Sequence, residues 1–449
     1  MNTATFLANS HKLLNGLYQF LEENEKDFGT IYKYKGLFNF YFVCHPDELK
    51  KIYVGTNRDY TRTTKYNKIV QSVFSDNSLF FADHEEWMTK RKKLNPFFTK
   101  QNVKQYHGMM HSVISEIIGK MVIQLSGDKA KSMDIYDISN QMIIKIVMGA
   151  FFNKKLKEEE FSEIMEWINV MRDYLGRIPY PIVSDPQMPT YLNLKIKKYE
   201  QKFRNFIKEI LDERIKGSND PEDLLSLIIK LYGKENEKGE IEIDEEAVVR
   251  EIYLAIFAGY ETSSATITWV FHLLAENKDK YEKLQREIDS SMKMDSISTE
   301  KIMELKYVDH VLSEVLRIKT APWITGRTAK KDVEISGQHV KKDSMVVLCP
   351  HFAHHDSNYW DDPKKFVPER WEDTNQNNIN KNSYMPFGAG PRKCIGMDFS
   401  KAEMKVIMVL MLMNFEFDID PDFTVKTAYG MTAYPENGLK MLVKRRNQD

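Results

Sequence analysis

One cysteine near the end of the chain lies where a reactive thiolate could form. Cys394 belongs to the glycine- and proline-rich segment Phe387–Gly396 (FGAGPRKCIG), which leads directly into a predicted helix. Free backbone N–H groups and the positive end of a helix dipole both favour a thiolate at this position. The residue alone leaves two other interpretations open, a catalytic nucleophile and a small buried apolar side chain. A nucleophile would need a base, and no histidine neighbours Cys394.

A second group of residues falls on one face of a long predicted helix. Ala255, Ala258, Gly259, Thr262 and Thr266 are spaced i, i+3, i+4, i+7 and i+11. A face of small side chains lets a flat molecule approach closely, and it equally allows close packing of two helices. A glycine inside a helix costs about 1 kcal/mol relative to alanine, so we expect a reason for Gly259.

Two charged or aromatic pairs also have helical spacing. Glu314 and Arg317 are i,i+3 neighbours, and Trp87 and Arg91 are i,i+4 neighbours. Taken alone, the first is typical of a surface ion pair, and the second of a core tryptophan beside a solvated arginine. The three histidines of the segment 351–355 suggest zinc, but no cysteine or carboxylate at familiar spacing completes such a site.

Together and in this order, the motifs resemble those of the cytochrome P450 family. The segment Phe387–Gly396 matches every fixed position of the haem-binding loop F-x-x-G-x-R-x-C-x-G. Ala258–Ser263 resembles the [AG]-G-x-[DE]-T-[TS] motif of the central helix, and Glu314–Arg317 the E-x-x-R motif. Phe366–Trp371 resembles the P-E-R-F segment. The likeness extends over about residues 25 to 440.

The resemblance implies a role for each matching residue. Cys394 would be the thiolate ligand of the iron of haem b, which favours O–O cleavage. Thr262 and Glu261 would be catalytic and handle protons. Glu314, Arg317 and Arg370 would form a structural network that holds the loop before the cysteine. The haem propionates and ring would contact a further set of residues: Trp87, Arg91, Arg327, Arg392, Phe387, Gly388, Gly396, Ala258 and Gly259.

The chain departs from many relatives after Arg317, where a Pro-Pro pair is replaced by the segment Ile318–Trp323. That segment borders the substrate in the family, so the change concerns what binds. We expect a largely apolar pocket, although each candidate is also an ordinary core residue by composition. The candidate pocket residues are Phe74, Phe80, Phe81, Phe257, Ala321, Trp323, Ile324, Met431 and Thr432.

The periodicity of apolar residues predicts a mainly α fold with a small β-rich lobe. Helical spacing dominates about residues 85–320 and 397–415, and Asp244 has the position of an N-cap. Strand-like segments lie at about 25–60, 320–350 and in the C-terminal tail. We expect one cytochrome P450-like domain over residues 1–449, with haem buried between the long central helix and the cysteine loop.

Composition excludes several classes of protein. The 64 basic and 65 acidic residues of the 449-residue chain give a net charge of −1, which disfavours a nucleic-acid binder. Hydrophobic residues make up 42%, enough for a large core, and three scattered cysteines exclude a disulfide scaffold. Neither a signal peptide nor a spanning segment is visible. We therefore expect a cytoplasmic, bacterial-type monomer without a membrane contact, and a removed N-terminal anchor stays an open alternative.

These observations predict a haem-thiolate monooxygenase that inserts one atom of O2 into a small organic substrate. We expect electrons from a separate ferredoxin or flavodoxin system, docked on a basic patch of Lys92, Lys93, Lys393, Lys401 and Lys405. Alternatives are a haem-thiolate enzyme of another reaction class (oxidative C–C coupling, desaturation, isomerisation or peroxygenation) and a non-enzymatic haem sensor. Thr262 and Glu261 argue against the sensor, which needs no acid–alcohol pair.

Overall fold

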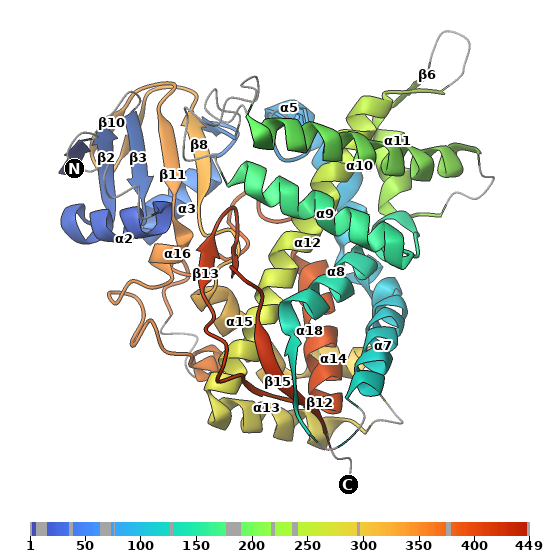
Figure 1. The fold of residues 1–449 in the computed structure, drawn as a ribbon. Coiled ribbons are helices and arrows are strands. Elements are labelled where there is room, and N and C mark those ends of the chain that lie inside the picture. Colours follow the sequence, from blue (N-terminus) through green and yellow to red (C-terminus); the bar gives the residue numbers. More distant parts are fainter. Residues whose placement is uncertain are drawn as a thin grey trace.

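Two regions make up the protein, a helical body and a smaller β-rich lobe (Figure 1). The computed structural model describes residues 2–5, 16–35, 39–62, 73–75, 77–125, 127, 129–176, 190–216, 221–235, 241–293, 297–373 and 379–446. The mainly α fold with a small β lobe confirms the fold class expected from periodicity.

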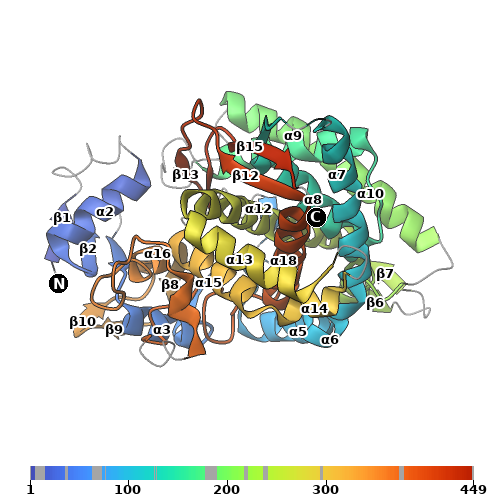
Figure 2. The same ribbon diagram turned by 90° about the horizontal axis from the view of Figure 1, so that it is seen from below.

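The helical body surrounds one long helix, α12, which runs through its centre in Figures 1 and 2. Shorter pieces, α6 (Lys100–Val103) and α16 (Pro350–Ala353), lie in connecting segments. The longer helices of the body are α5 (His84–Leu94), α7 (His107–Gln124), α8 (Ile135–Phe152), α9 (Glu158–Leu175), α10 (Tyr191–Lys216), α11 (Leu224–Tyr232), α12 (Glu245–Glu276), α13 (Lys278–Ser291), α14 (Thr299–Glu304), α15 (Lys306–Ile318) and α18 (Met397–Asn414).

The β-rich lobe combines N-terminal strands with strands from residues 325–348, as the blue and orange strands of Figure 1 show. Helices α2 (Leu17–Phe28) and α3 (Pro46–Gly55) flank its strands. Strand β11 pairs in parallel with β3 and antiparallel with β8, so residues about 300 positions apart lie side by side. In the described part of the chain the sheet has the order β1 (Asn2–Thr5), β2 (Ile31–Lys35), β3 (Asn39–Val43), β11 (Met345–Leu348), β8 (Thr325–Ala329) and β4 (Tyr60–Thr61).

Smaller sheets complete the fold. Strands β5 (Lys131–Asp134), β12 (Phe415–Ile419) and β15 (Lys440–Arg445) join the C-terminal tail to the helical body. Hairpins pair β9 (Val333–Ile335) with β10 (Gln338–Val340), and β13 (Thr427–Tyr429) with β14 (Ala433–Pro435). Just before α12, β6 (Gly233–Glu235) pairs antiparallel with β7 (Ile241–Ile243).

Helix α12 forms the core because apolar residues cover most of its circumference. Its N-cap is Asp244, whose carboxylate accepts the N–H of Ala247 at 3.0 Å, as the sequence predicted. Helices α8 and α18 pack against it. A buried polar bond also joins it to α18, because the Ser263 hydroxyl donates to Glu403 Oε1 at 2.6 Å. The helix that carries Thr262 and Glu261 is therefore fixed to the helix that follows the cysteine loop.

Candidate cofactor site

Cys394 ends the loop that precedes α18. Its backbone N–H donates to the carbonyl of Phe387 at 3.0 Å, and its side chain is exposed to solvent. Surrounding protein atoms nevertheless desolvate the sulfur and raise the pKa of Cys394, while the Gly396 N–H and the nearby Arg91 act in the opposite direction. The raised pKa does not prevent metal binding, because a metal ion that reaches the sulfur displaces its proton. Whether Cys394 can be a ligand therefore depends on how accessible its sulfur is. The thiol is thus available to a ligand from outside the chain.

Glycines shape this loop for two different reasons. Gly390 has φ +69°, and a Cβ there would lie 2.4 Å from the backbone oxygen of Tyr53 in α3, so only glycine fits. Gly388 has the same φ, but its Cβ would meet Tyr53 at an ordinary 3.7 Å. At Gly396 the nearest atom, on Phe98, is 3.9 Å away, so no protein neighbour requires glycine at this position.

Two buried arginines from distant segments converge beside the loop. Arg392 donates through Nε to Asn57 Oδ1 at 2.5 Å, through Nη1 to the Phe80 carbonyl at 3.1 Å, and through Nη2 to the Ala82 carbonyl. Its guanidinium also lies 4.8 Å from the centre of the Trp87 ring. These contacts hold the guanidinium in one orientation.

The second buried arginine, Arg327 of β8, donates to Thr56 Oγ1 at 3.0 Å and to the Gly326 carbonyl at 2.7 Å. Arg91 of α5 donates to the Lys393 carbonyl at 2.9 Å, one residue before the cysteine. Arg62 donates to the Arg392 carbonyl at 3.3 Å. Arg62 and Arg91 therefore contact the cysteine loop, Arg392 belongs to it, and Arg327 lies near enough to Arg392 to lower its pKa.

Among the described residues no carboxylate forms an ion pair with any of these four arginines, although Asp83 acts on Arg392 from a distance. Nη2 of Arg327 and Nε of Arg62 are buried without a hydrogen-bond partner. Burial lowers the pKa of Arg327 and of Arg392 to about 10, so both stay charged at neutral pH. Buried charges need partners. A thiol beside unmatched guanidinium groups fits a haem, whose iron takes a thiolate and whose propionates take cations.

The predicted small-residue face of α12 divides into two parts. Ala258 is exposed and Thr262 half-buried, on a helix whose other residues are mostly buried. A Cβ on Gly259, by contrast, would lie 3.2 Å from Phe151 and 3.4 Å from Val147 of α8. Close packing of α12 against α8 thus explains the glycine. A role for Gly259 in the approach of a flat cofactor stays a prediction.

The proton-handling pair is placed differently from what the sequence suggested. The Thr262 hydroxyl donates to the Ala258 carbonyl at 3.0 Å, which leaves its oxygen lone pairs as acceptors. Glu261 is only 2% exposed, and Arg172 of α9 donates to both of its oxygens at 3.1 Å. The Thr432 hydroxyl donates to the same carboxylate at 2.9 Å. Glu261 is therefore a buried carboxylate that is held by hydrogen bonds from Arg172 and Thr432, and it has almost no contact with solvent.

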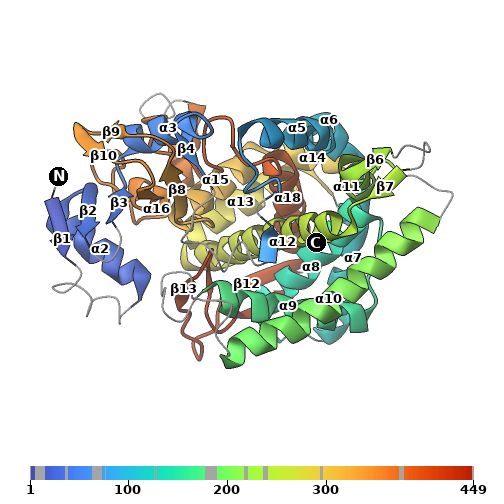
Figure 3. The same cartoon turned by 90° about the horizontal axis from the view of Figure 1, so that it is seen from above.

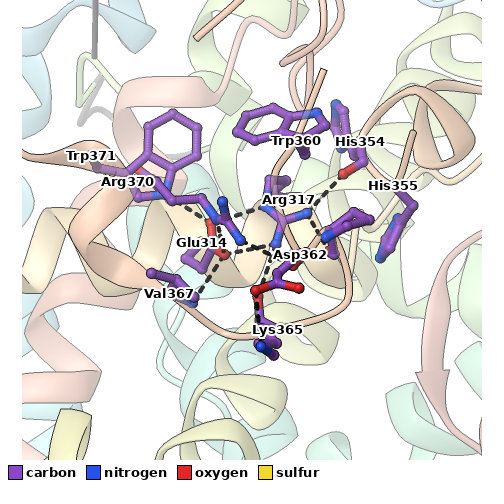
Figure 4. Close-up of polar contacts among 12 residues, drawn as sticks. Glu314, Arg317, His354, His355, Trp360, Asp362, Lys365, Val367, Arg370 and Trp371 are labelled. Carbon is purple, nitrogen blue, oxygen red and sulfur yellow. Dashed lines mark hydrogen bonds and ion pairs between the residues drawn. The ribbon is translucent and has the colours of Figure 1, made fainter. Parts of the chain in front are cut away.

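The structure brings together the expected network at α15, drawn in Figure 4. Glu314 and Arg317 are both fully buried and joined by bonds of 2.7 and 3.0 Å, and Arg370 donates to Glu314 at 3.3 Å. Trp371 adds a bond of 3.0 Å to the carboxylate, and Arg317 donates to the backbone carbonyl of His354 at 2.8 Å. The network fixes the long segment before the cysteine loop.

The pocket candidates do not form one lining. Phe74 and Phe257 are buried with ring centres 5.5 Å apart, and Phe80 and Phe81 lie edge to face at 4.8 Å. Trp323 is fully buried in the core of the β lobe, where its indole N–H donates to the Gly430 carbonyl at 2.7 Å. Its ring packs against the aromatic residues of that core, so its contact with substrate stays a prediction.

The remaining candidates lie near Trp323 or Glu261. Ala321 is buried, and its carbonyl accepts the N–H of Ala433 at 3.2 Å. Thr432 is committed to Glu261, while Ile324 and Met431 are half-buried. These residues form a packed border between the lobe and α12, and the structure leaves their contact with substrate as a prediction.

Sequence reasoning missed two arginines at the site. Arg62 belongs to no motif, and Arg172 lies on the polar side of an amphipathic helix, as many surface residues do. Only the three-dimensional arrangement places them beside Cys394 and Glu261. His354 lies 2.7 Å from the Thr320 hydroxyl through Nδ1 and accepts the Met385 N–H through Nε2 at 2.9 Å. Among the described residues no group of three or more His, Cys, Asp or Glu side chains could hold a metal ion.

Comparison with known proteins identifies the family. The cytochrome P450 model matches residues 3–443. Curated relatives include "Cytochrome P450 3A6" of Oryctolagus cuniculus, 28% identical over 432 residues that cover 92% of this chain and 84% of the relative. "Cytochrome P450 3A5" of Homo sapiens is 29% identical over 430 residues, with 92% and 83% covered. The chain belongs to the cytochrome P450 family.

As a cytochrome P450, the protein is a haem-thiolate monooxygenase with haem b as its cofactor, which confirms the predicted enzyme class. It uses O2, an organic substrate and a redox partner. The relatives named above are mammalian, so the expectation of a bacterial-type member gains no support. Within the described residues no helix is long and apolar enough to cross a membrane.

Proposed function

We propose that this cytochrome P450 oxidises a largely apolar small molecule with Cys394 as the iron ligand. One observation carries the assignment: an accessible thiol lies beside four arginines without carboxylate partners. When bound, the haem supplies O2 activation and oxygen insertion into the substrate. The protein's own groups then bind, orient and move protons.

Four arginines and a tryptophan would hold the haem. Arg62, Arg91, Arg327 and Arg392 supply cationic donors for the propionates, and Trp87 supports Arg392 by a ring contact. Asn57 and the carbonyls at positions 80 and 82 fix the direction of the Arg392 guanidinium. The Arg392 guanidinium is therefore preorganised for binding before the cofactor arrives.

Two residues of α12 would divide the proton work. Thr262 uses its hydrogen on the Ala258 carbonyl, so its oxygen is oriented to accept a hydrogen bond from a water. Arg172 holds both oxygens of Glu261, so a change in these two bonds would change how the carboxylate takes part in proton transfer. Arg172 would thus control when the carboxylate takes part.

Electrons would come from a separate ferredoxin or flavodoxin that docks beside the cysteine loop. Lys92, Lys93 and Lys393 are exposed there and can attract an acidic partner. Lys405 is not available for docking, because it is buried and pairs with Asp309 at 3.0 Å. Lys401 is half-buried over the Phe387 ring. The proposed docking patch therefore shrinks to its exposed lysines.

The absorbance of the reduced, CO-treated protein tests the iron ligand. A maximum near ~450 nm indicates a thiolate ligand on ferrous carbonyl haem. We expect that maximum in the wild type and its loss in Cys394→Ala. Cys349→Ala is a matched control, because that thiol is buried in the β lobe. A Cys394→Ala protein that keeps the band would overturn the assignment.

A panel of apolar compounds tests the substrate class. An apolar compound that binds in place of water at the haem should convert the ferric iron from low to high spin. The shift of the Soret band measures this conversion. A sensor would show such binding without substrate-dependent consumption of NAD(P)H by a surrogate reductase. Turnover with product formation separates the monooxygenase from a sensor, and product structure separates hydroxylation from coupling or desaturation.

A further inference from the structure

A buried carboxylate on α12, far along the helix from Glu261, belongs to none of the motifs. Glu251 is 3% exposed, and its two oxygens accept the backbone N–H of Leu79 at 3.0 and 3.1 Å. The Tyr232 hydroxyl donates to the same carboxylate at 2.5 Å. Figure 3 shows α5 and α11 on the same side of α12. Three helices thus meet at the segment that contains Leu79.

A buried ammonium completes this cluster. Lys90 of α5 is 4% exposed and donates to Tyr232 Oη at 2.9 Å and to Asn77 Oδ1 at 2.8 Å. It also pairs with Glu86 at 3.2 Å. Carboxylate, phenol and ammonium therefore form a chain of hydrogen bonds from α12 through α11 to α5, and both ends hold the segment Asn77–Ala82.

The same segment holds a cofactor arginine from its other side. The carbonyls of Phe80 and Ala82 accept hydrogen bonds from the two Nη groups of Arg392. The guanidinium of Arg62 lies 4.2 Å from the centre of the Phe80 ring. Phe80 follows Leu79 directly in the chain. The bonds from Leu79 to Glu251 therefore oppose a shift of the carbonyls that orient Arg392.

We propose that Glu251 is a positioning residue for Arg392, which it orients through the segment Asn77–Ala82. The proposal rests on the role proposed above for Arg392 as a binder of the haem propionates. A carboxylate suits this task because a charged acceptor forms shorter and stronger bonds than a neutral one. Tyr232 and Lys90 offset the cost of its burial.

Haem release tests the proposal in a double-mutant cycle. The variants are Glu251→Gln, Arg392→Lys and their combination, each loaded with haem and checked by its CO spectrum. Transfer of ferric haem to excess apomyoglobin gives the release rate. We expect each single variant to release haem about tenfold faster, as for partners that orient a ligand. The double variant should be no more than about twofold faster than Arg392→Lys, because the two residues act as one unit.

Independent effects would overturn the inference. If the two rate increases multiply in the double variant, Glu251 does not act through Arg392. If Arg392→Lys accelerates release and Glu251→Gln does not, only the inference fails. If Arg392→Lys has no effect, the proposed role of Arg392 fails as well.

Two further variants separate positioning from loss of stability. Asp223 is a matched control, because it is also a buried carboxylate, 4% exposed, and pairs with Arg214 at 2.7 Å without touching the segment Asn77–Ala82. Asp223→Asn should lower the melting temperature and leave haem release unchanged; faster release would mean that any such loss of stability suffices and would overturn the inference. If Glu251→Gln does not fold, Tyr232→Phe takes its place in the cycle, with the same expected outcomes.

Discussion

At the scale of single residues, the hydroxyl of Thr262 has its hydrogen committed and its lone pairs free. Thr262→Ala removes an acceptor for a water without changing the helix, so we expect more peroxide per product and slower product formation. Thr262→Ser should restore most of the coupling. The measurement is the stoichiometry of NAD(P)H, O2, peroxide and product.

Thr268→Ala serves as the control for that variant. Its hydroxyl makes the same kind of bond, to the Ser264 carbonyl at 2.7 Å, but the residue is fully buried. Coupling should stay at the wild-type value in Thr268→Ala. Unchanged coupling in Thr262→Ala would mean that another group handles the protons.

Gly390 and Gly388 offer a comparison that isolates one steric contact. Both have φ +69°, so alanine at either position carries the same backbone cost of about 1–2 kcal/mol. Only at Gly390 does the new Cβ strike backbone, the carbonyl of Tyr53. We expect Gly388→Ala to fold and bind haem with a modestly lower melting temperature, and Gly390→Ala to lose haem binding. Equal behaviour of the two would show that α3 yields to the added methyl group.

Residue types and spacing predicted the site residues of the cysteine loop well, and those of other segments less well. The thiol, Arg392 and the Glu314–Arg317 pair follow from tight local motifs, and the structure brings each to a consistent place. The place of Trp323 in the core of the β lobe was not predicted, because an apolar side chain that lines a pocket and one that fills a core look alike in sequence. Arg62 and Arg172 act through contacts with distant segments, which no local pattern encodes.

At the scale of elements, one ion pair joins α9 to α12. Arg172→Gln leaves Glu261 as a buried charge without its cation, which typically costs about 3–5 kcal/mol. We expect a clearly lower melting temperature for Arg172→Gln. Arg172→Gln combined with Glu261→Gln should recover much of that loss, since no isolated charge remains. Circular dichroism of the four proteins of the cycle measures both effects.

Another element contact predicts a pH dependence. Glu403 of α18 is buried, and desolvation raises its pKa from 4.5 to about 8 despite the bond from Ser263. The folded state then binds one more proton than the unfolded state between these values. This stabilisation is complete below about pH 4.5 and is lost as the pH rises to about 8, by at most about 1.4 kcal/mol per pH unit.

Glu403→Gln removes the titrating group and keeps a hydrogen bond to Ser263. The melting temperature of this variant should therefore decline less between pH 5 and 8 than that of the wild type. Glu416→Gln is a control, because Glu416 lies on β12 and pairs at the surface with Lys444. Parallel pH curves for wild type and Glu403→Gln would contradict the assignment of the proton to Glu403.

Element type was predictable where periodicity was strong. The long apolar pattern and the N-cap at Asp244 predicted α12. The helix predicted at 397–415 corresponds to α18, which ends one residue earlier, at Asn414. The pairing of β6 with β7 was missed because Lys and Glu on a short hairpin resemble a solvated loop. The division of α12 into a packed side at Gly259 and an open side at Ala258 depends on α8, which the helix's own sequence does not describe.

At the scale of the whole molecule, the exposed lysines around the cysteine loop make electron transfer sensitive to salt. Charge reversal in Lys92→Glu and Lys393→Glu should slow reduction by an acidic ferredoxin or flavodoxin at low ionic strength. The difference should shrink as salt screens the charges. Lys440→Glu is the control, because Lys440 is an exposed residue at the start of β15. Equal reduction rates for all proteins at low salt would remove the docking patch.

The overall architecture was predictable as a class but not as a set of contacts. Strand-like segments at both ends of the chain indicated one lobe, and its sheet does combine β3 with β11 and β8. Which strand lies beside which depends on long-range packing. The arginines of the cofactor site illustrate the same limit, because Arg62 follows β4 and Arg327 lies in β8, two strands that are neighbours only in the folded sheet.

The order of the strands also has a consequence for biosynthesis. β3 leaves the ribosome about 300 residues before its neighbour β11, which at about 5–20 residues per second is a wait of about 15–60 s. Cys394 emerges later still. β3 can pair with β2 early, but its other edge must stay open until β11 emerges, and haem can be captured only after Cys394 has emerged.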